Sequence, residues 1–268
     1  MEGVNAVVHL GAYFPQPRLD EVTRGRTQHE IDMMCFNVNV PGTFNMLEAT
    51  ARHCPGCERF VFASSDVVYE PRLYSPADEE HPIGLRHTRP IRLGTYSGWY
   101  ETSKVVGEDM AVHYYTRFGL PTVRVRFAGV SGPWELELGS TERMLDGLKA
   151  QSEKSKEVLE QTRFLEKSLA EGKTLVLQKT KDGRTAIRDS DYVLDAVHGV
   201  ICMLESKNAI GQAFNVASPG PYSMEDAVQY AAKVFGTDYA TLTVPEVGYR
   251  FLSTAKARSM IGFRPEYD

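Results

Sequence analysis

The chain has 268 residues and a formal net charge of -5, with 42% hydrophobic and 24% charged residues. This length suffices for one large or two small domains with a buried core, and the composition is that of a globular protein. The acidic balance argues against nucleic acid or an anionic membrane surface as a partner.

Two further features of the sequence bear on where the protein works. No apolar run approaches the ~20 residues that span a bilayer. The N-terminus carries no basic segment before its short apolar run, so it does not resemble a signal peptide. We therefore expect a cytoplasmic protein without a membrane segment.

Short apolar runs alternate with helical patterns along the chain, which predicts an α/β protein with a parallel sheet. The expected strands cover residues 6–10, 60–63, 122–127, 175–177 and 213–217. The expected helices cover residues 32–53, 97–118, 140–171 and 191–205, and a further one starts near residue 223. A loop rich in proline and charged residues is expected from residue 70 to about residue 93.

The 4 cysteines do not suggest a disulfide framework in a chain of this length. Cys54 and Cys57 have CxxC spacing across Pro55-Gly56, but Cys35 and Cys202 lack histidines at metal-ligand spacing, so no metal site is expected. We favour a Pro-Gly turn between a helix and a strand, and a redox pair is the alternative.

Tyr100 and Lys104 are four positions apart, which places them on the same face of the expected helix. A phenol with its usual pKa near 10 is a poor acid or base at neutral pH. A nearby ammonium lowers that pKa and suits the tyrosine to exchange a proton with a substrate hydroxyl. The alternative is an ordinary ion-pairing position on a solvated helix face.

Ser64, Ser65 and Asp66 follow an expected strand at its carboxyl end, where open α/β sheets bind their ligands. The Tyr100 helix comes after one loop, so we expect the Ser65 hydroxyl and the phenol to converge on one substrate oxygen. The alternative for these three residues is a helix cap or turn.

A series of blocks resembles, in order and over nearly the whole chain, the extended short-chain dehydrogenase/reductases of the NAD-dependent nucleotide-sugar epimerase/dehydratase family. The blocks are residues 9–12, 39–49, 60–69, 100–108, 126–133, 188–195, 214–217, 253–258 and 261–265. The resemblance implies a Rossmann-type parallel sheet with a smaller C-terminal α/β substrate region. Residues 1–133 would form a partial NAD(P)-binding domain, and residues 134–268 a substrate-binding region interleaved with the last Rossmann elements.

The same resemblance implies roles for individual residues. Ser65 would polarise the substrate oxygen, Tyr100 would be the acid/base, and Lys104 would tune Tyr100 and hold the nicotinamide ribose. The residues expected along NAD or NADP are Leu10, Gly11, Ala12, Ser64, Tyr100, Lys104, Phe127 and Val130.

The residues expected at the substrate are Asp66, Val67 and Arg188. Arg188 matches the arginine that often meets the diphosphate of a nucleotide-sugar, and guanidinium groups suit bidentate phosphate recognition. A salt bridge from Arg188 to Asp189 or Asp191 is the alternative.

Three departures from the family pattern qualify this expectation. The GxxGxxG phosphate-binding loop does not occur, and the chain opens on what resembles the fourth strand, which indicates a truncated chain or mis-assigned start rather than an evolved half-domain. Its first strand would then have an unpaired edge. Val67 replaces the glutamate of the 4,6-dehydratases, and Gly129 replaces an asparagine of many sugar-nucleotide epimerases.

The sequence therefore predicts an NAD(P)-dependent epimerase/dehydratase-type oxidoreductase, either an epimerase or a dehydrogenase/reductase. Its substrate would be a small molecule with a secondary alcohol, such as a sugar or nucleotide-sugar. The resemblance also implies a homodimer formed through the helices that carry Asn39 and Tyr100. The alternative is a catalytically silent homologue or fragment that no longer binds the cofactor and acts as a binding or scaffold protein.

Overall fold

The computed structural model describes residues 3–14, 25–69, 99–132, 140–149 and 155–267, so the expected loop at 70–93 lies outside the described residues. Its helices are α1 (Gln28–His53), α2 (Trp99–Phe118), α3 (Ser140–Lys149), α4 (Lys156–Ala170), α5 (Val193–Glu205), α6 (Met224–Phe235) and α7 (Ala255–Ile261), with short 3-10 turns η1 (Asp66–Val68) and η3 (Lys207–Ala209). Its strands are β1 (Ala6–His9), β2 (Arg59–Ser65), β3 (Thr122–Phe127), β4 (Gly129–Ser131), β5 (Lys173–Lys179), β6 (Ile187–Arg188), β7 (Ser190–Tyr192), β8 (Ala213–Val216), β9 (Tyr222–Ser223), β10 (Asp238–Thr243) and β11 (Tyr249–Arg250).

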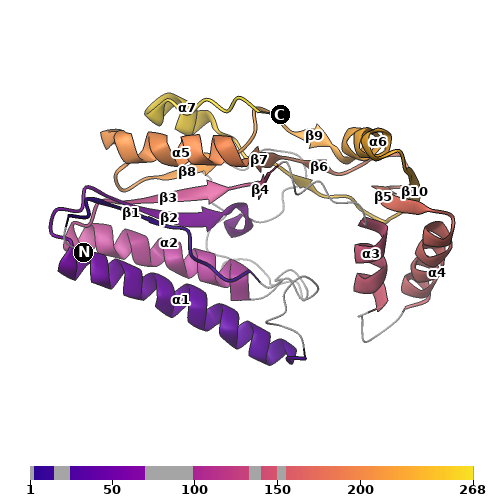
Figure 1. Cartoon of the computed structure of the whole chain (residues 1–268), viewed down its shortest axis with the longest axis horizontal. Helices are drawn as coiled ribbons and strands as arrows, with labels where there is room; N and C mark the ends of the chain where they lie inside the picture. The colour runs from indigo at the N-terminus through magenta and orange to yellow at the C-terminus, as the bar shows by residue number, and fades with distance from the viewer. Residues whose placement is uncertain (1–2, 15–24, 70–98, 133–139, 150–154, 268) are drawn as a thin grey trace.

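The main sheet has the strand order β1-β2-β3-β8, and each neighbouring pair is parallel. Helices α1 and α2 cover one face of this sheet, and α5 and α7 cover the other (Figure 1). The prediction of an α/β protein with a parallel sheet is therefore confirmed.

Strand β2 shows why this part of the sequence is continuously apolar. Successive side chains of a strand point to opposite faces. Phe60 and Phe62 pack with Leu47 on the α1 and α2 side, whereas Val61 and Ala63 pack on the α5 and α7 side. Because both faces are covered, every position from Phe60 to Ala63 is buried.

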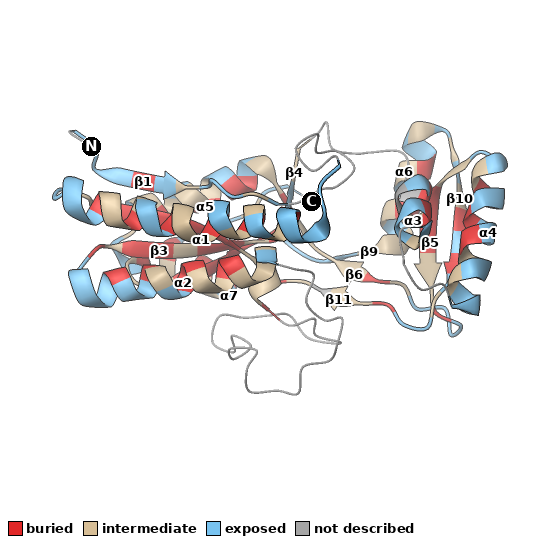
Figure 2. Cartoon of the chain, turned by 90° about the horizontal axis from the view of Figure 1, so that it is seen from below, coloured by how far each residue is buried: buried red, intermediate tan, exposed pale blue. Residues whose placement is uncertain are grey.

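A smaller unit is built on the parallel pair β5 and β10, with α3 and α4 on one side and α6 on the other. Val176 packs with Leu145 and Leu165, while Leu175 packs with Val228 on the opposite face. The short strands β6, β9 and β11 lie between this unit and the main sheet (Figures 1 and 2).

Three helix boundaries differ from the predicted ones. Helix α1 begins at Gln28 because Thr27 and Glu30 form a capping box, in which each side chain bonds the backbone N–H of the other. Residues 140–171 hold two helices, and Ser155 caps the second. Asp191 lies in β7, so α5 starts two residues later than predicted, at Val193.

Gly107 provides a test of the packing between α2 and the main sheet. A methyl group at Gly107 would overlap the Phe62 ring. We expect Gly107→Ala to lower the free energy of unfolding by about 1–3 kcal/mol, measured by urea denaturation. Gly147→Ala is the matched control, because nothing lies within 4 Å of that added methyl group. Equal stability of the Gly107→Ala variant and the parent protein would contradict the described packing.

Candidate functional site

A cavity of about 810 Å³ lies at the carboxyl ends of β1, β2 and β3 and reaches α5. Its position matches the edge at which open α/β sheets bind ligands. The predicted site residues that line it are Leu10, Ala12, Ser64, Ser65, Asp66, Val67, Tyr100, Lys104, Phe127, Val130 and Arg188. Gly11 is the predicted residue that is not part of the lining.

Lys104 is buried in α2, one turn after Tyr100. Its Nζ donates a hydrogen bond of 2.7 Å to the Ala63 carbonyl and lies 5.4 Å from the centre of the Tyr100 ring. Burial lowers the pKa of Lys104 to about 8, against the opposing influence of Cys35 and Glu108. At pH 7 Lys104 is therefore still protonated in most molecules, and its positive charge lies beside the Tyr100 ring.

Ser65 ends β2 and caps η1. Its Oγ donates to Asp66 Oδ1 at 3.0 Å and accepts from the Val67 N–H at 3.4 Å. The capping alternative is thus confirmed for Ser65, which also lines the cavity. To polarise a substrate oxygen, the Ser65 hydroxyl would have to exchange its bond with Asp66 for one to the substrate.

Asn39 positions the segment after β1, a role that the sequence analysis did not assign. Its Oδ1 accepts from the Tyr13 N–H at 2.6 Å, and its Nδ2 donates to the Tyr13 carbonyl at 2.9 Å and to Ser103 Oγ at 3.0 Å. Ser103 in turn donates to the Tyr100 carbonyl at 2.6 Å. The Phe14 ring packs edge-on against the Tyr100 ring, with ring centres 4.6 Å apart. Asn39 therefore holds this segment against the first turn of α2.

Helix α5 forms an apolar wall of the cavity that sequence reasoning also missed. The wall residues are Val193, Ala196, Val197, Val200 and Ile201. In the sequence, the helical spacing of these residues marks them as one face of α5. The same spacing occurs on any helix face that packs on a core, so it does not identify a cavity wall.

Arg188 lies on the cavity wall, and its Nη1 donates to the carbonyls of Ile187 at 3.1 Å and Gly248 at 2.8 Å. Asp189 Oδ2 accepts the Leu252 N–H at 2.6 Å. Backbone carbonyls therefore fix the Arg188 guanidinium at the cavity.

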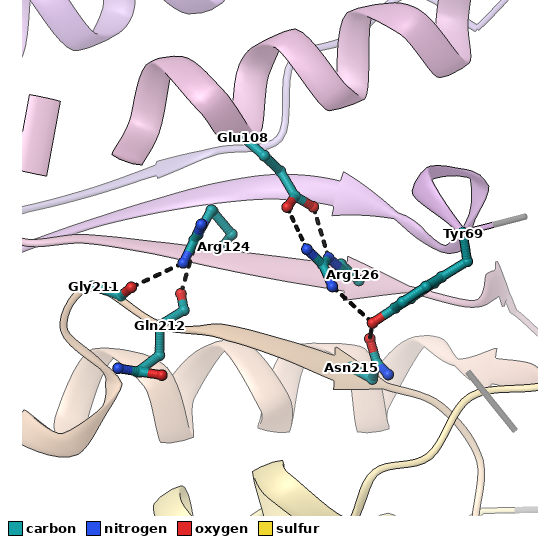
Figure 3. A network of polar contacts seen from close by, with 7 residues as sticks. All are labelled: Tyr69, Glu108, Arg124, Arg126, Gly211, Gln212 and Asn215. Carbon is teal, nitrogen blue, oxygen red and sulfur yellow. Dashed lines mark hydrogen bonds and ion pairs between the residues drawn. The ribbon is translucent and has the colours of Figure 1, made fainter. Parts of the chain in front are cut away.

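A buried polar network anchors α2 to the main sheet (Figure 3). Arg126 of β3 donates to both carboxylate oxygens of Glu108, at 2.8 and 2.6 Å, and to Tyr69 Oη at 2.8 Å. Tyr69 donates to Asn215 Oδ1 of β8 at 2.8 Å. Burial alone would raise the pKa of Glu108, but the hydrogen bonds and charge of Arg126 hold it below its usual value. Glu108 lies one turn after Lys104, so the network fixes the helix that carries Tyr100 and Lys104.

Asp191 is a buried acid whose register partner, Val130, lines the cavity. Its carboxyl group is fully buried and finds no hydrogen-bond partner among the described residues. Burial raises its pKa to about 8, and the negative charges of Asp195 and Asp189 add to this effect. Both neighbouring carboxylates accept backbone N–H groups, Asp195 from Glu266 and Tyr267 and Asp189 from Leu252.

Asp191 should make stability depend on pH. The folded protein keeps a proton up to about pH 8 that the unfolded chain loses near its usual pKa of 3.8. The contribution to stability is therefore full below pH 4 and is lost as pH rises to about 8. We expect Asp191→Asn to raise the free energy of unfolding by a few kcal/mol at pH 8, and by little at pH 4. Urea denaturation across this range measures the difference, and parallel profiles would contradict the assignment.

Neither a membrane-spanning helix nor a cluster of metal-binding side chains occurs among the described residues. No described helix has the length and apolarity needed to cross a membrane. Within the same residues, no three histidine, cysteine or acidic side chains converge as a metal site would require.

Comparisons with known proteins show the family to which the chain belongs. The model of the NAD dependent epimerase/dehydratase family matches residues 2–217. The chain is 31% identical over 126 residues to uronate dehydrogenase from Pseudomonas syringae pv. tomato, covering 47% of this chain and 37% of that protein. It is 25% identical over 247 residues to UDP-glucuronate 4-epimerase 6 from Arabidopsis thaliana, covering 86% of this chain and 47% of that protein. The chain thus spans less than half the length of these curated relatives.

Solved structures show the same fold. A short-chain dehydrogenase/reductase superfamily protein from Agrobacterium tumefaciens with bound NAD superposes with a TM-score of 0.70 at 26% identity, covering 100% of this chain and 76% of that one. UDP-glucuronic acid 4-epimerase from Bacillus cereus in complex with NAD superposes with a TM-score of 0.66 at 22% identity, covering 99% and 71%.

Proposed function

The chain belongs to the NAD-dependent epimerase/dehydratase family, and from this premise we propose that it transfers a hydride between NAD(P) and a secondary alcohol of a sugar. The observation that carries the proposal is that Ser65, Tyr100 and Lys104 all line one cavity at the carboxyl edge of the sheet. A volume of about 810 Å³ is ample for a small substrate beside a nicotinamide.

The residues present fit a nicotinamide nucleotide. Leu10, Ala12, Phe127 and Val130 offer apolar contacts along the cavity, and Lys104 offers a cation for ribose hydroxyls. When bound, the nicotinamide would accept or return the hydride.

The protein's own groups would handle the proton. Tyr100 takes the proton of the substrate hydroxyl during oxidation and returns it during reduction. The ammonium of Lys104, held by the Ala63 carbonyl, stabilises the phenolate that this exchange requires. Ser65 hydrogen-bonds the same substrate oxygen and orients the alcohol.

The cavity favours a substrate with an anionic group, because Arg188 is fixed at its wall. A carboxylate and a diphosphate both suit a guanidinium. The names of the relatives, uronate dehydrogenase and UDP-glucuronate 4-epimerase, share a uronic acid. We therefore place the substrate among free or nucleotide-linked uronic acids.

The test supplies the chain with NAD⁺ and either galacturonate or UDP-glucuronate. Formation of NADH with the free acid indicates a dehydrogenase, and inversion of the nucleotide-sugar without net NADH indicates an epimerase. Galactose and UDP-glucose, which lack the carboxylate, are the controls and should react poorly. Equal rates with and without the carboxylate would refute the uronic acid assignment.

A second candidate function is a silent homologue that acts as a binding or scaffold protein. It is favoured by β1, which pairs only with β2 among the described strands and leaves Val8 exposed. Calorimetry with NADH separates the two candidates. Binding that Lys104→Met weakens supports the enzyme, and no binding supports the scaffold.

We also propose a homodimer through the outer faces of α1 and α2. These faces expose Met33, Val38 and Phe44 on α1 and Val112 and Tyr115 on α2. Exposed apolar side chains on two neighbouring helices are typical of an interface. The double change Phe44→Glu, Val112→Glu should yield a monomer by light scattering, whereas Val234→Glu on α6 should leave the mass unchanged. A parent protein that is itself monomeric would refute the proposal.

A further inference from the structure

Cys54 and Cys57 lie together in the turn between α1 and β2, remote from the proposed active site. The Cys57 N–H donates to the Cys54 carbonyl at 3.0 Å, which closes the Pro-Gly turn. The two thiols donate to backbone carbonyls on either side of the turn, Cys54 to Val4 and Cys57 to Arg59. Both line a separate cavity of about 420 Å³ beside Tyr114 and Phe118, and both are free thiols.

The Cys54 thiol connects this turn to the first strand. Its Sγ donates to the Val4 carbonyl at 2.7 Å, and the Glu58 N–H donates to the neighbouring Asn5 carbonyl at 2.7 Å. These bonds hold the residues that lead into β1, which is paired on one side by β2. Strand β1 contributes Val8 to the lining of the main cavity.

We propose that Cys54 and Cys57 are a dithiol that closes to a disulfide by exchange with a small-molecule disulfide, and that closure releases the anchor of β1. The thiolate of Cys57 attacks one sulfur of the small disulfide and expels a thiolate. Cys54 then loses its proton to solvent and attacks the Cys57 sulfur of the mixed disulfide, expelling the second thiolate. Two protein thiols and one disulfide thereby become one protein disulfide and two small thiols.

The position of the two cysteines at the end of α1 determines how fast this exchange occurs and how stable the disulfide is. Cys54 is the C-cap of α1, where the helix dipole disfavours a negative charge. Burial raises the pKa of Cys57. Because the structure does little to stabilise a thiolate, the pair reacts slowly, and its disulfide resists reduction once formed. This is the opposite of a catalytic dithiol with a low pKa.

Closure takes the Cys54 hydrogen from the Val4 carbonyl. The residues just before β1 then keep the hydrogen bond from the Glu58 N–H to the Asn5 carbonyl. They lose the hydrogen bond from the Cys54 thiol to the Val4 carbonyl. The backbone amides of β1 should therefore exchange faster with solvent in the oxidised protein.

The test incubates the full chain with oxidised glutathione, blocks the remaining thiols with N-ethylmaleimide and digests with trypsin. Cleavage after Arg52 and Arg59 yields one peptide, residues 53–59, that contains both cysteines. We expect this peptide to lose two hydrogens and take up no maleimide, while Cys35 and Cys202 remain alkylated. Cys57→Ser should block closure.

Hydrogen exchange of residues 3–9 gives the second measurement. Oxidation and the variant Cys54→Ala should both accelerate exchange, whereas Cys57→Ala should not, because Cys57 donates to the Arg59 carbonyl instead. A fully alkylated peptide, or a stable glutathione adduct, overturns the disulfide. Unchanged exchange after closure overturns the link to β1.

Discussion

Tyr100→Phe is expected to lower kcat by at least about a hundredfold, because a positioned acid/base contributes roughly 10²–10⁴ in rate. The change removes only the hydroxyl that would carry the substrate proton. The phenylalanine ring still packs against Phe14 and still faces the Lys104 ammonium. We therefore expect KM and the stability of the fold to change little.

Steady-state rates with NAD⁺ and the uronic acid substrate measure this effect. Tyr115→Phe is the matched control, since Tyr115 lies on the exposed face of the same helix. A kcat for Tyr100→Phe within a few-fold of the parent value would remove Tyr100 from the mechanism. Loss of NADH binding in calorimetry would mean that the tyrosine acts on the cofactor instead.

Arg126→Met is expected to lower the free energy of unfolding by about 3–5 kcal/mol, the usual cost of removing one partner of a buried ion pair. The arginine and Glu108 are both buried, and removal of the guanidinium takes away both of its hydrogen bonds to the carboxylate. Tyr69 would lose its donor as well. Urea denaturation at pH 7 measures the loss.

Two further variants separate the loss of the ion pair from the loss of packing. Arg124→Met should cost less, because the Arg124 guanidinium bonds only backbone carbonyls, those of Gly211 and Gln212, in the contacts of Figure 3. The double change Arg126→Met, Glu108→Gln should recover part of the loss, because no charge is then buried alone. Equal costs for Arg124→Met and Arg126→Met would show that the ion pair contributes nothing beyond packing.

Strands β2, β3 and β8 of the main sheet were predictable from the sequence because they are buried on both faces. The predicted strand at 122–127 coincides with β3, and β2 extends the predicted 60–63 by one residue before and two after. Strands β4 and β7 were not predicted. Each has three residues, and they form by pairing with each other across about sixty intervening positions, which no local pattern encodes.

The site was predictable to the extent that it follows from strand ends and helix spacing. The Ser65 position follows from the end of β2, and the pairing of Tyr100 with Lys104 follows from one helical turn. The apolar wall from α5 and the bonds of Asn39 to Tyr13 and Ser103 depend on tertiary packing. A buried acid such as Asp191 leaves no periodic signal at all.

The order of strands in the main sheet constrains how the protein can be synthesised. Strand β8 pairs with β3, yet the chain between Phe127 and Ala213 first builds α3, α4 and β5 of the smaller unit. At ribosomal speed these roughly 85 residues take on the order of ten seconds. During that interval the nascent chain presents the open edge of β3, with Val123 and Val125 uncovered by α5 and α7. A chaperone that binds short apolar strands would find its best target on the growing polypeptide at this stage.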